Sequence, residues 1–181
     1  MQVLAIDGSP KGHGHTAVVL SEVLRTTEGL GADTELVSLV DVDMEQVIDQ
    51  IGRADGVIMG SPVYRASYAF PLKNLLDHLP RGMAEWGETR APLQGKPVVA
   101  VTTSASLHHF LALNDLRNVL ANFFASHVVP PGLHVAHEGF IDDERLVESF
   151  AGLAARQGQA LVEMIVAMRE SPTLRSLVPQ A

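Results

Sequence analysis

The segment DGSPKGHGHT, residues 7–16, has the residue types of an anion-binding loop and lies between an apolar run and a segment with helical periodicity. Its glycines let the backbone approach a ligand closely, and free N–H groups at the start of the next helix attract negative charge. Ser9 and Thr16 add hydroxyl donors, Lys11 adds a positive charge, and Gly14 leaves space beside the backbone. The segment predicts a site for one phosphate monoester. The alternative is a plain strand-to-helix turn that uses these residues for their conformations.

Two familiar nucleotide patterns are absent from this segment. In G-x-x-x-x-G-K-[ST] the lysine follows the glycines, whereas Lys11 precedes Gly12 and Gly14. The pattern G-x-G-x-x-G is absent as well. We therefore expect neither a nucleoside triphosphate nor a dinucleotide bound in the Rossmann manner.

Two further segments have residues that suit a planar ligand. The segment SPVYRAS, residues 61–67, carries Tyr64 and Arg65 after a strand-like run, and Ser67 is a candidate N-cap for the next helix. Tyr64 can stack on a flat ring or pack, half-exposed, against a neighbouring element. The segment TTSAS, residues 102–106, is small and rich in hydroxyls, which suits a backbone surface under a planar ligand.

The eight histidines include two close pairs, His13 with His15 and His108 with His109. Neither pair has the i, i+4 spacing of metal ligands on a helix, so we expect exposed or hydrogen-bonded imidazoles and no metal. His15 is a candidate phosphate contact. No Ser-His-Asp or G-x-S-x-G arrangement indicates a serine nucleophile.

The elements that must position these segments alternate regularly along the chain. Apolar runs and period-two alternation predict strands over residues 2–7, 33–39, 56–60, 96–103 and 127–136. Apolar residues at helical spacing predict helices over residues 15–28, 44–53, 68–79 and 106–125, and a last helix that begins near Glu144.

Five strands that alternate with five helices predict an α/β three-layer sandwich, with a five-stranded parallel sheet and helices on both faces. The glycine-rich first turn favours the flavodoxin-like strand order 2-1-3-4-5. Pro130 and Pro131 cannot donate to a sheet, which suits a fifth strand at an edge. Ligands of such folds bind beyond the carboxyl ends of the strands, where the three segments above meet. We expect a single domain over residues 1–175 and a short tail over 176–181.

Composition narrows the class of protein. The 181 residues are 46% hydrophobic and 19% charged, without an apolar run long enough to span a bilayer, and no secretory signal precedes the first strand. We expect a cytoplasmic protein that does not bind membranes. The net charge of −8 opposes binding to nucleic acids. The absence of cysteine excludes disulfides, thiolate metal sites and cysteine nucleophiles.

Taken together, the three segments resemble the NAD(P)H-dependent FMN reductase family of flavodoxin-like flavoproteins. The resemblance lies in GSPKGHGHT (residues 8–16), GSPVYRASYAFPLKNLLDHLP (60–80) and LQGKPVVAVTTSAS (93–106), and it extends over most of residues 1–140. The middle segment is the most specific, because it joins a ligand loop to its helix with the spacing of the family.

The resemblance implies FMN as cofactor and NAD(P)H as co-substrate. By position, it implies a phosphate site, a surface along the flavin and a border on the pyrimidine side of its ring. These sites comprise, in that order, Ser9, Lys11, Gly14, His15 and Thr16; Pro62, Val63, Tyr64 and Arg65; and Thr103, Ser104 and Ala105. Lys11 stands where the family usually has arginine, Gly14 where serine is common, and SAS where the family often has two glycines. No catalytic side chain is indicated.

The activity that the resemblance implies is hydride transfer from a nicotinamide to flavin N5. The reduced flavin then passes electrons to free flavin, a partner monooxygenase, a quinone or a similar acceptor, and the protein is a homodimer or homotetramer. Two alternatives stay open at this stage: a flavodoxin-type electron carrier without efficient direct NAD(P)H oxidation, and a binding or regulatory domain that has lost flavin.

Overall fold

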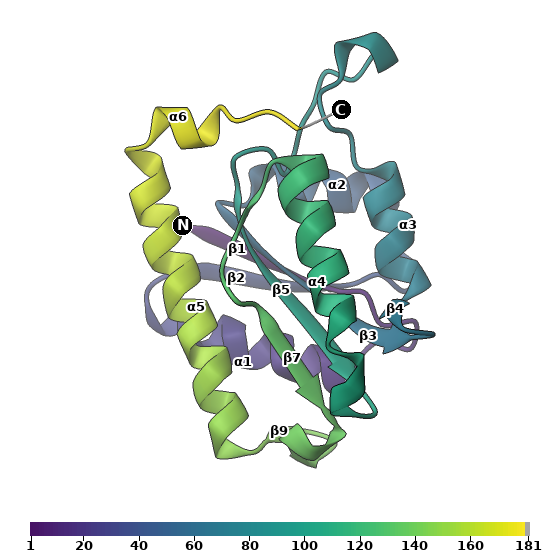
Figure 1. Ribbon diagram of the computed structural model, residues 1–181. Coiled ribbons are helices and arrows are strands. Elements are labelled where there is room, and N and C mark those ends of the chain that lie inside the picture. Colours follow the sequence, from purple (N-terminus) through teal and green to yellow (C-terminus); the bar gives the residue numbers. More distant parts are fainter. Residues whose placement is uncertain (180–181) are drawn as a thin grey trace.

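Apolar segments that are buried on both faces form the centre of the sheet. In the computed structural model, which describes residues 1–179, the parallel strands run in the order β2-β1-β3-β5, and β6 and β7 both pair with the outer edge of β5 (Figure 1). The bounds are β1 Gln2–Asp7, β2 Asp33–Ser38, β3 Gly56–Tyr64, β5 Pro97–Ser104, β6 His127–Val128 and β7 Leu133–Ala136. The predicted flavodoxin-like order is thus confirmed, with the fifth strand in two pieces.

The break in the fifth strand lies at its two prolines. His127 and Val128 pair with the start of β5, and β7 pairs with its end, from Val101 to Ser104. Pro130 and Pro131 lie between the two pieces, where their missing N–H groups would interrupt a continuous ladder. The edge position predicted for this strand is confirmed.

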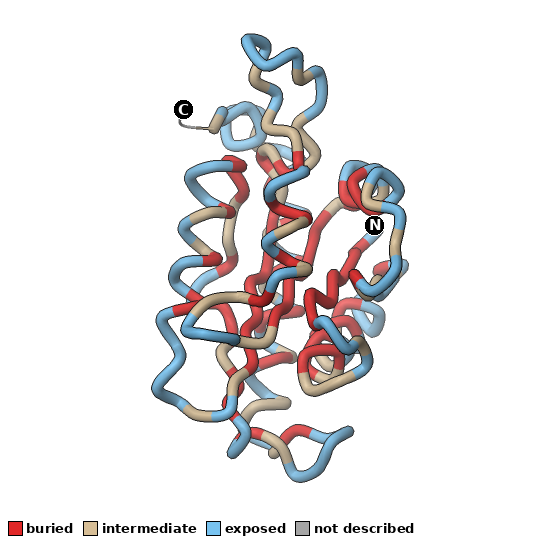
Figure 2. Tube along the Cα trace, turned by 90° about the vertical axis from the view of Figure 1, so that its right-hand side faces the viewer, coloured by how far each residue is buried: buried red, intermediate tan, exposed pale blue. Residues whose placement is uncertain are grey.

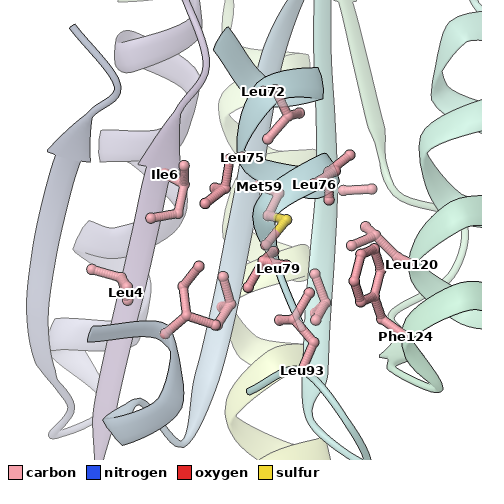
Figure 3. Packing of buried hydrophobic residues seen from close by; sticks show 14 of the residues in the cluster. Leu4, Ile6, Met59, Leu72, Leu75, Leu76, Leu79, Leu93, Leu120 and Phe124 are labelled. Atoms are coloured by element: carbon pink, nitrogen blue, oxygen red, sulfur yellow. The ribbon is translucent and has the colours of Figure 1, made fainter. Parts of the chain in front are cut away.

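Two layers of helices cover the sheet. Residues of α1 and α5 pack in the apolar cluster on one face, and residues of α2, α3 and α4 pack in the cluster on the other. Leu72 and Leu75 of α3 belong to this second cluster, together with Ile6 and Met59 of the strands (Figure 3). The buried residues therefore lie in the sheet and on the faces of the helices that pack against it (Figure 2). The helices are α1 His15–Gly29, α2 Met44–Arg53, α3 Phe70–His78, α4 Leu111–Asn118, α5 Glu148–Arg169 and the short α6 Pro172–Arg175.

Shorter elements complete the chain. A turn of π-helix, Val119–Phe123, extends α4, so the helix predicted over 106–125 is present but irregular. The segment 80–95 projects at the end of the molecule opposite the hairpin of β8 (Phe140–Asp142) and β9 (Arg145–Leu146) (Figure 1). The short 3-10 turns are η1 Ala84–Trp86, η2 Leu107–His109 and η4 His137–Gly139. None of the helices between residues 1 and 179 is long and apolar enough to cross a membrane.

Two local predictions were wrong. The last helix begins at Glu148 and not near Glu144, because β8 (Phe140–Asp142) and β9 (Arg145–Leu146) form a hairpin there. The Asp142 carboxylate accepts a hydrogen bond from the Glu144 N–H (3.0 Å) and so stabilises a turn instead of a helix start.

Ser67 is not the N-cap of α3, which was the second error. It lies in β4 (Ser67–Tyr68), which pairs with the end of β3, and α3 begins only after Ala69. The Ala69 N–H instead donates to Ser61 Oγ (2.8 Å), which is buried at the end of the sheet. The hydroxyl that fixes the entry to α3 therefore comes from the strand.

Lys96 ties the start of β5 to the end of α2. Its Nζ donates to the carbonyl oxygens of Ile51, Gly52 and Ala54 at 2.5–3.1 Å. Burial lowers the pKa of Lys96 from 10.5 to about 8. Between these two values the unfolded chain binds more protons at this site than the folded chain, so stability rises with pH.

We expect the free energy of unfolding to rise by about 1–2 kcal/mol from about pH 7.5 to about pH 10 through Lys96 alone. The rise stays below the value that burial alone would give, because three carbonyl oxygens at a helix end stabilise the charged form. Urea unfolding of the wild type and of Lys96→Met at both pH values isolates this contribution. A variant with the same pH dependence as the wild type would contradict the expectation.

Candidate functional site

The carboxyl ends of β1, β3 and β5 lie side by side, and the three segments that follow them border one cleft of about 540 Å³. That volume is within the range of small-molecule and cofactor sites. Eleven of the twelve predicted site residues line the cleft: Ser9, Lys11, Gly14, His15, Thr16, Pro62, Val63, Tyr64, Thr103, Ser104 and Ala105. Arg65 is not among the lining residues, and His137 is an additional one.

The first loop leads into the N-terminus of α1 at this cleft. Gly12 and His13, within the loop, both have left-handed backbone conformations (φ 61° and 49°). The first helical hydrogen bond runs from the Val18 N–H to the Gly14 carbonyl, so the N–H groups before Val18 have no acceptor within α1. The first turn of α1 carries no acidic side chain. This geometry suits an anion at the N-terminus of the helix.

Asp7 fixes the start of the loop from beneath. Its carboxylate accepts a hydrogen bond from the Ser9 N–H (2.9 Å), and its other oxygen is buried without a partner. Burial raises the pKa of Asp7, and the Ser9 N–H opposes this shift.

Hydroxyl groups join the first loop to the third. Thr16 Oγ1 and Thr103 Oγ1 lie 2.8 Å apart, and both residues are buried. Behind the third loop, His134 of β7 contacts Thr102 Oγ1 through Nδ1 (2.9 Å) and Ser104 Oγ through Nε2 (3.2 Å). Burial lowers the pKa of His134, which favours the neutral imidazole. The sequence does not point to His134, because its position beside Thr102 depends on the pairing of β5 with β7.

The second loop is the tight turn of the β3–β4 hairpin. Tyr64 and Ser67 pair across it, and Arg65 and Ala66 at its tip both have positive φ values (54° and 66°), as in a type I′ turn. Tyr64 lines the cleft with 49% of its surface exposed, so an exposed aromatic borders the site. The turn directs Arg65 to the tip of the hairpin.

We expect Ala66→Gly to stabilise the protein by about 0.5–1 kcal/mol, because glycine adopts a left-handed conformation without the steric cost of a Cβ. Urea unfolding measures the change. Ala167→Gly, at an exposed position in α5, is the matched control and should destabilise by a similar amount. A loss of stability in Ala66→Gly would rule out the strained turn.

The hairpin of β8 and β9 approaches the first loop. The ring of His15 stacks on Phe140, with ring centres 4.0 Å apart and planes 14° apart, and its Nε2 lies 3.4 Å from Asp143 Oδ1. The ring centre of His137 is 6.1 Å from that of His15. The sequence does not predict these contacts, because no local pattern brings residues 137–143 to residue 15.

The residues of the cleft fit FMN. Hydroxyls, a lysine and a helix N-terminus converge at one end, as a phosphate monoester requires. Pro62, Val63 and Tyr64 supply an apolar and aromatic wall, and Thr103 to Ala105 supply a small-residue edge, as a flat ring with polar edges requires.

Comparison with known proteins agrees with this chemistry. The family model for NADPH-dependent FMN reductases matches residues 1–140. The chain belongs to this family. Its class as an NAD(P)H:flavin oxidoreductase, with FMN as flavin and NAD(P)H as co-substrate, is thereby confirmed at the level of the family.

Several known proteins are similar to the chain in sequence or in structure. The NADH-dependent FMN reductase SfnF of Pseudomonas putida is 36% identical over 59% of this chain and 52% of its own. The FMN reductase (NADPH) of Escherichia coli strain K12 is 28% identical over 82% of this chain and 76% of its own. The solved apo structure of the NADH:FMN oxidoreductase EMOB aligns over 97% of this chain and 94% of its own, with 25% identity and a TM-score of 0.74.

Proposed function

We propose that this FMN reductase oxidises NADH or NADPH and delivers reduced flavin, or its electrons, to a second acceptor. The observation that carries the proposal is the convergence of the three loops on one cleft, with phosphate donors at one end and an exposed aromatic along the side. Either feature alone suits many ligands, whereas the combination suits a flavin mononucleotide.

The proposed roles of the side chains follow their positions. Lys11, Ser9 and Thr16 bind the phosphate together with the amides of the first turn of α1. Tyr64 packs along the ring system, and Ser104 borders its polar edge. When bound, FMN supplies a ring that accepts hydride from a nicotinamide and passes electrons on. The chain binds and orients both molecules and needs no acid or base for hydride transfer.

The acceptor is proposed from the family. Relatives carry names for NADH-dependent and for NADPH-dependent FMN reductases, so both nicotinamides are candidates for this chain. We propose free flavin used by a partner monooxygenase, or a quinone, as acceptor. An electron carrier of the flavodoxin type is the less favoured alternative, since the likeness to a flavodoxin from the domain Archaea (17% identity, TM-score 0.65) extends to the fold alone.

Steady-state kinetics test the proposal. Purified protein is assayed with NADH and with NADPH, each against FMN, riboflavin and a soluble quinone, and FMN binding is measured by quenching of flavin fluorescence. We expect FMN binding and nicotinamide oxidation well above the protein-free rate. Binding without faster oxidation would favour the carrier, and protein that neither binds FMN nor oxidises a nicotinamide would reject both.

We also propose a homodimer formed through the face of α3 and α4. Phe70, at the start of α3, is 75% exposed, and Leu107, Phe110 and Leu111 near the start of α4 are each more than half exposed. Large apolar side chains gathered near one end of two adjacent helices suit a protein interface. Light scattering should give twice the mass of the 19.4 kDa chain, or a multiple of it. A monomer at micromolar concentration would contradict this.

A further inference from the structure

The hydroxyl of Ser104, in the third loop of the cleft, has no hydrogen left for a ligand. Its Oγ lies 2.6 Å from the Ser106 carbonyl oxygen and 3.2 Å from His134 Nε2. A carbonyl oxygen can only accept, so the hydroxyl is the donor in the shorter contact. A hydroxyl carries a single hydrogen, and Ser104 Oγ therefore offers only acceptor positions to a molecule in the cleft that it lines.

The longer contact fixes which nitrogen of His134 carries a hydrogen. Because the hydrogen of Ser104 is already donated, His134 Nε2 must be the donor in this contact. Burial lowers the pKa of His134, which favours the neutral ring, and Nδ1 then has no hydrogen. Nδ1 accepts from Thr102 Oγ1, which lies 2.9 Å away in a fully buried residue. Donation thus runs in one direction, from Thr102 through His134 to Ser104.

The pairing of β5 with β7 holds the ring of His134 in this position. His134 lies opposite Thr102 in the parallel register. Its neighbours Leu133 and Val135 are buried in the apolar cluster of α1 and α5, so alternation along the strand directs His134 to the other face of the sheet. The ring is therefore positioned by the strand and not by a loop.

We propose that His134 is a positioning residue that keeps Ser104 an acceptor-only group, so that the edge of the ligand against Ser104 carries an N–H donor. The inference rests on the proposed function and deepens it. In oxidised flavin the ring system has one N–H group, at N3, and its other polar atoms accept. A ligand acceptor against Ser104 would leave two acceptors facing each other without a hydrogen, which a binding site disfavours.

The protonation of His134 is measured without any ligand. Side-chain nitrogen signals of the nitrogen-15-labelled wild type are recorded by NMR at about pH 8, where an ordinary imidazole is neutral. The signals of His134 are those lost in His134→Gln. We expect a protonated Nε2 and an unprotonated Nδ1. A ring protonated at Nδ1 only, or at both nitrogens, would overturn the inference.

The effect on binding is measured by quenching of flavin fluorescence with riboflavin and with 3-methylriboflavin, which lacks the N3–H group. The wild type should bind riboflavin at least about tenfold more tightly. His134→Leu leaves the Ser104 hydroxyl free to rotate and should lower this ratio about threefold or more. His134→Gln keeps a donor toward Ser104 and should keep the ratio within about twofold. His127→Leu is the matched control in β6, where His127 contacts the Leu174 carbonyl instead, and should not change the ratio.

A second variant separates this role from a merely structural one. Ser104→Ala should lower the ratio, and adding His134→Leu to it should have no further effect. If circular dichroism shows that His134→Leu is unfolded, Thr102→Val removes the donor to Nδ1 and should lower the ratio instead.

Two results would overturn the inference and leave the proposed function intact. One is a wild type that binds both flavins equally, and the other is a folded His134→Leu that weakens both to the same extent. A wild type that binds neither flavin would reject the proposed function and the inference that rests on it.

Discussion

The double variant Lys11→Ala, Thr16→Val is expected to bind FMN about 100-fold more weakly than the wild type. Hydrogen bonds to a charged phosphate contribute about 1.5–3 kcal/mol each, and the variant removes a hydroxyl and a cation from the same end of the cleft. Valine keeps the shape of Thr16 but also removes its contact with Thr103 Oγ1, so a ligand without the phosphate is needed to separate the two effects. Fluorescence quenching measures the dissociation constant.

Riboflavin and a neighbouring serine supply the controls for this prediction. Riboflavin lacks the phosphate, so its affinity for the double variant should stay within about threefold of the wild type. Ser21→Ala changes an exposed hydroxyl further along α1 and should leave FMN affinity unchanged. Equal losses for FMN and riboflavin would show that the loop supports the ring and not the phosphate.

Gly8→Ala is expected to destabilise the protein by about 3 kcal/mol or more. A Cβ at Gly8 would lie 2.7 Å from Leu72 Cβ and 2.9 Å from the carbonyl oxygen of Gly60. Both are held in place, since Leu72 is fully buried and the Gly8 N–H donates to that carbonyl (2.8 Å). Overpacking a rigid contact of this kind costs about 1–3 kcal/mol, and here backbone on both sides must move.

Gly52→Ala is the matched control for Gly8→Ala. A Cβ at Gly52, near the end of α2, meets nothing within 4 Å, and alanine favours the helical conformation more than glycine does. This variant should be more stable than the wild type by about 0.5–1 kcal/mol. Urea unfolding of both variants measures whether each substitution raises or lowers the free energy of unfolding. A neutral Gly8→Ala would mean that α3 can shift away from the carboxyl end of β1 at little cost.

Much of the fold was predictable because its signals are local. Period-two and helical patterns gave α2 over residues 44–53 as observed, and β1 over 2–7 likewise. The order of the strands followed from the alternation of elements and from a proline-containing edge strand. The cleft followed from that order, since the carboxyl ends of neighbouring parallel strands must lie together.

The hairpin of β8 and β9 was not predictable from those signals. The residues from Glu148 onward form a long helix. The acidic residues just before Glu148 are also common in the first turn of a helix, so the sequence predicts a helix start that is too early. The turn is stabilised by the Asp142 carboxylate, which accepts a hydrogen bond from the backbone N–H of Glu144. The hairpin contacts His15 through Phe140 and Asp143, which lie 125 or more positions away in the sequence. Only the assembled sheet brings these residues together.

The hydroxyl contact between Thr16 and Thr103 joins the loop proposed to bind the phosphate to the loop proposed to border the ring. A substitution of Thr103 in the third loop would remove the hydroxyl partner of Thr16, and so would also alter the first turn of α1. Under the proposed function, retention of the flavin and tuning of its ring would consequently not be independent traits in this protein. Relatives that bind a flavin but use a different electron acceptor should therefore differ from this chain near Thr16 as well as in the third loop.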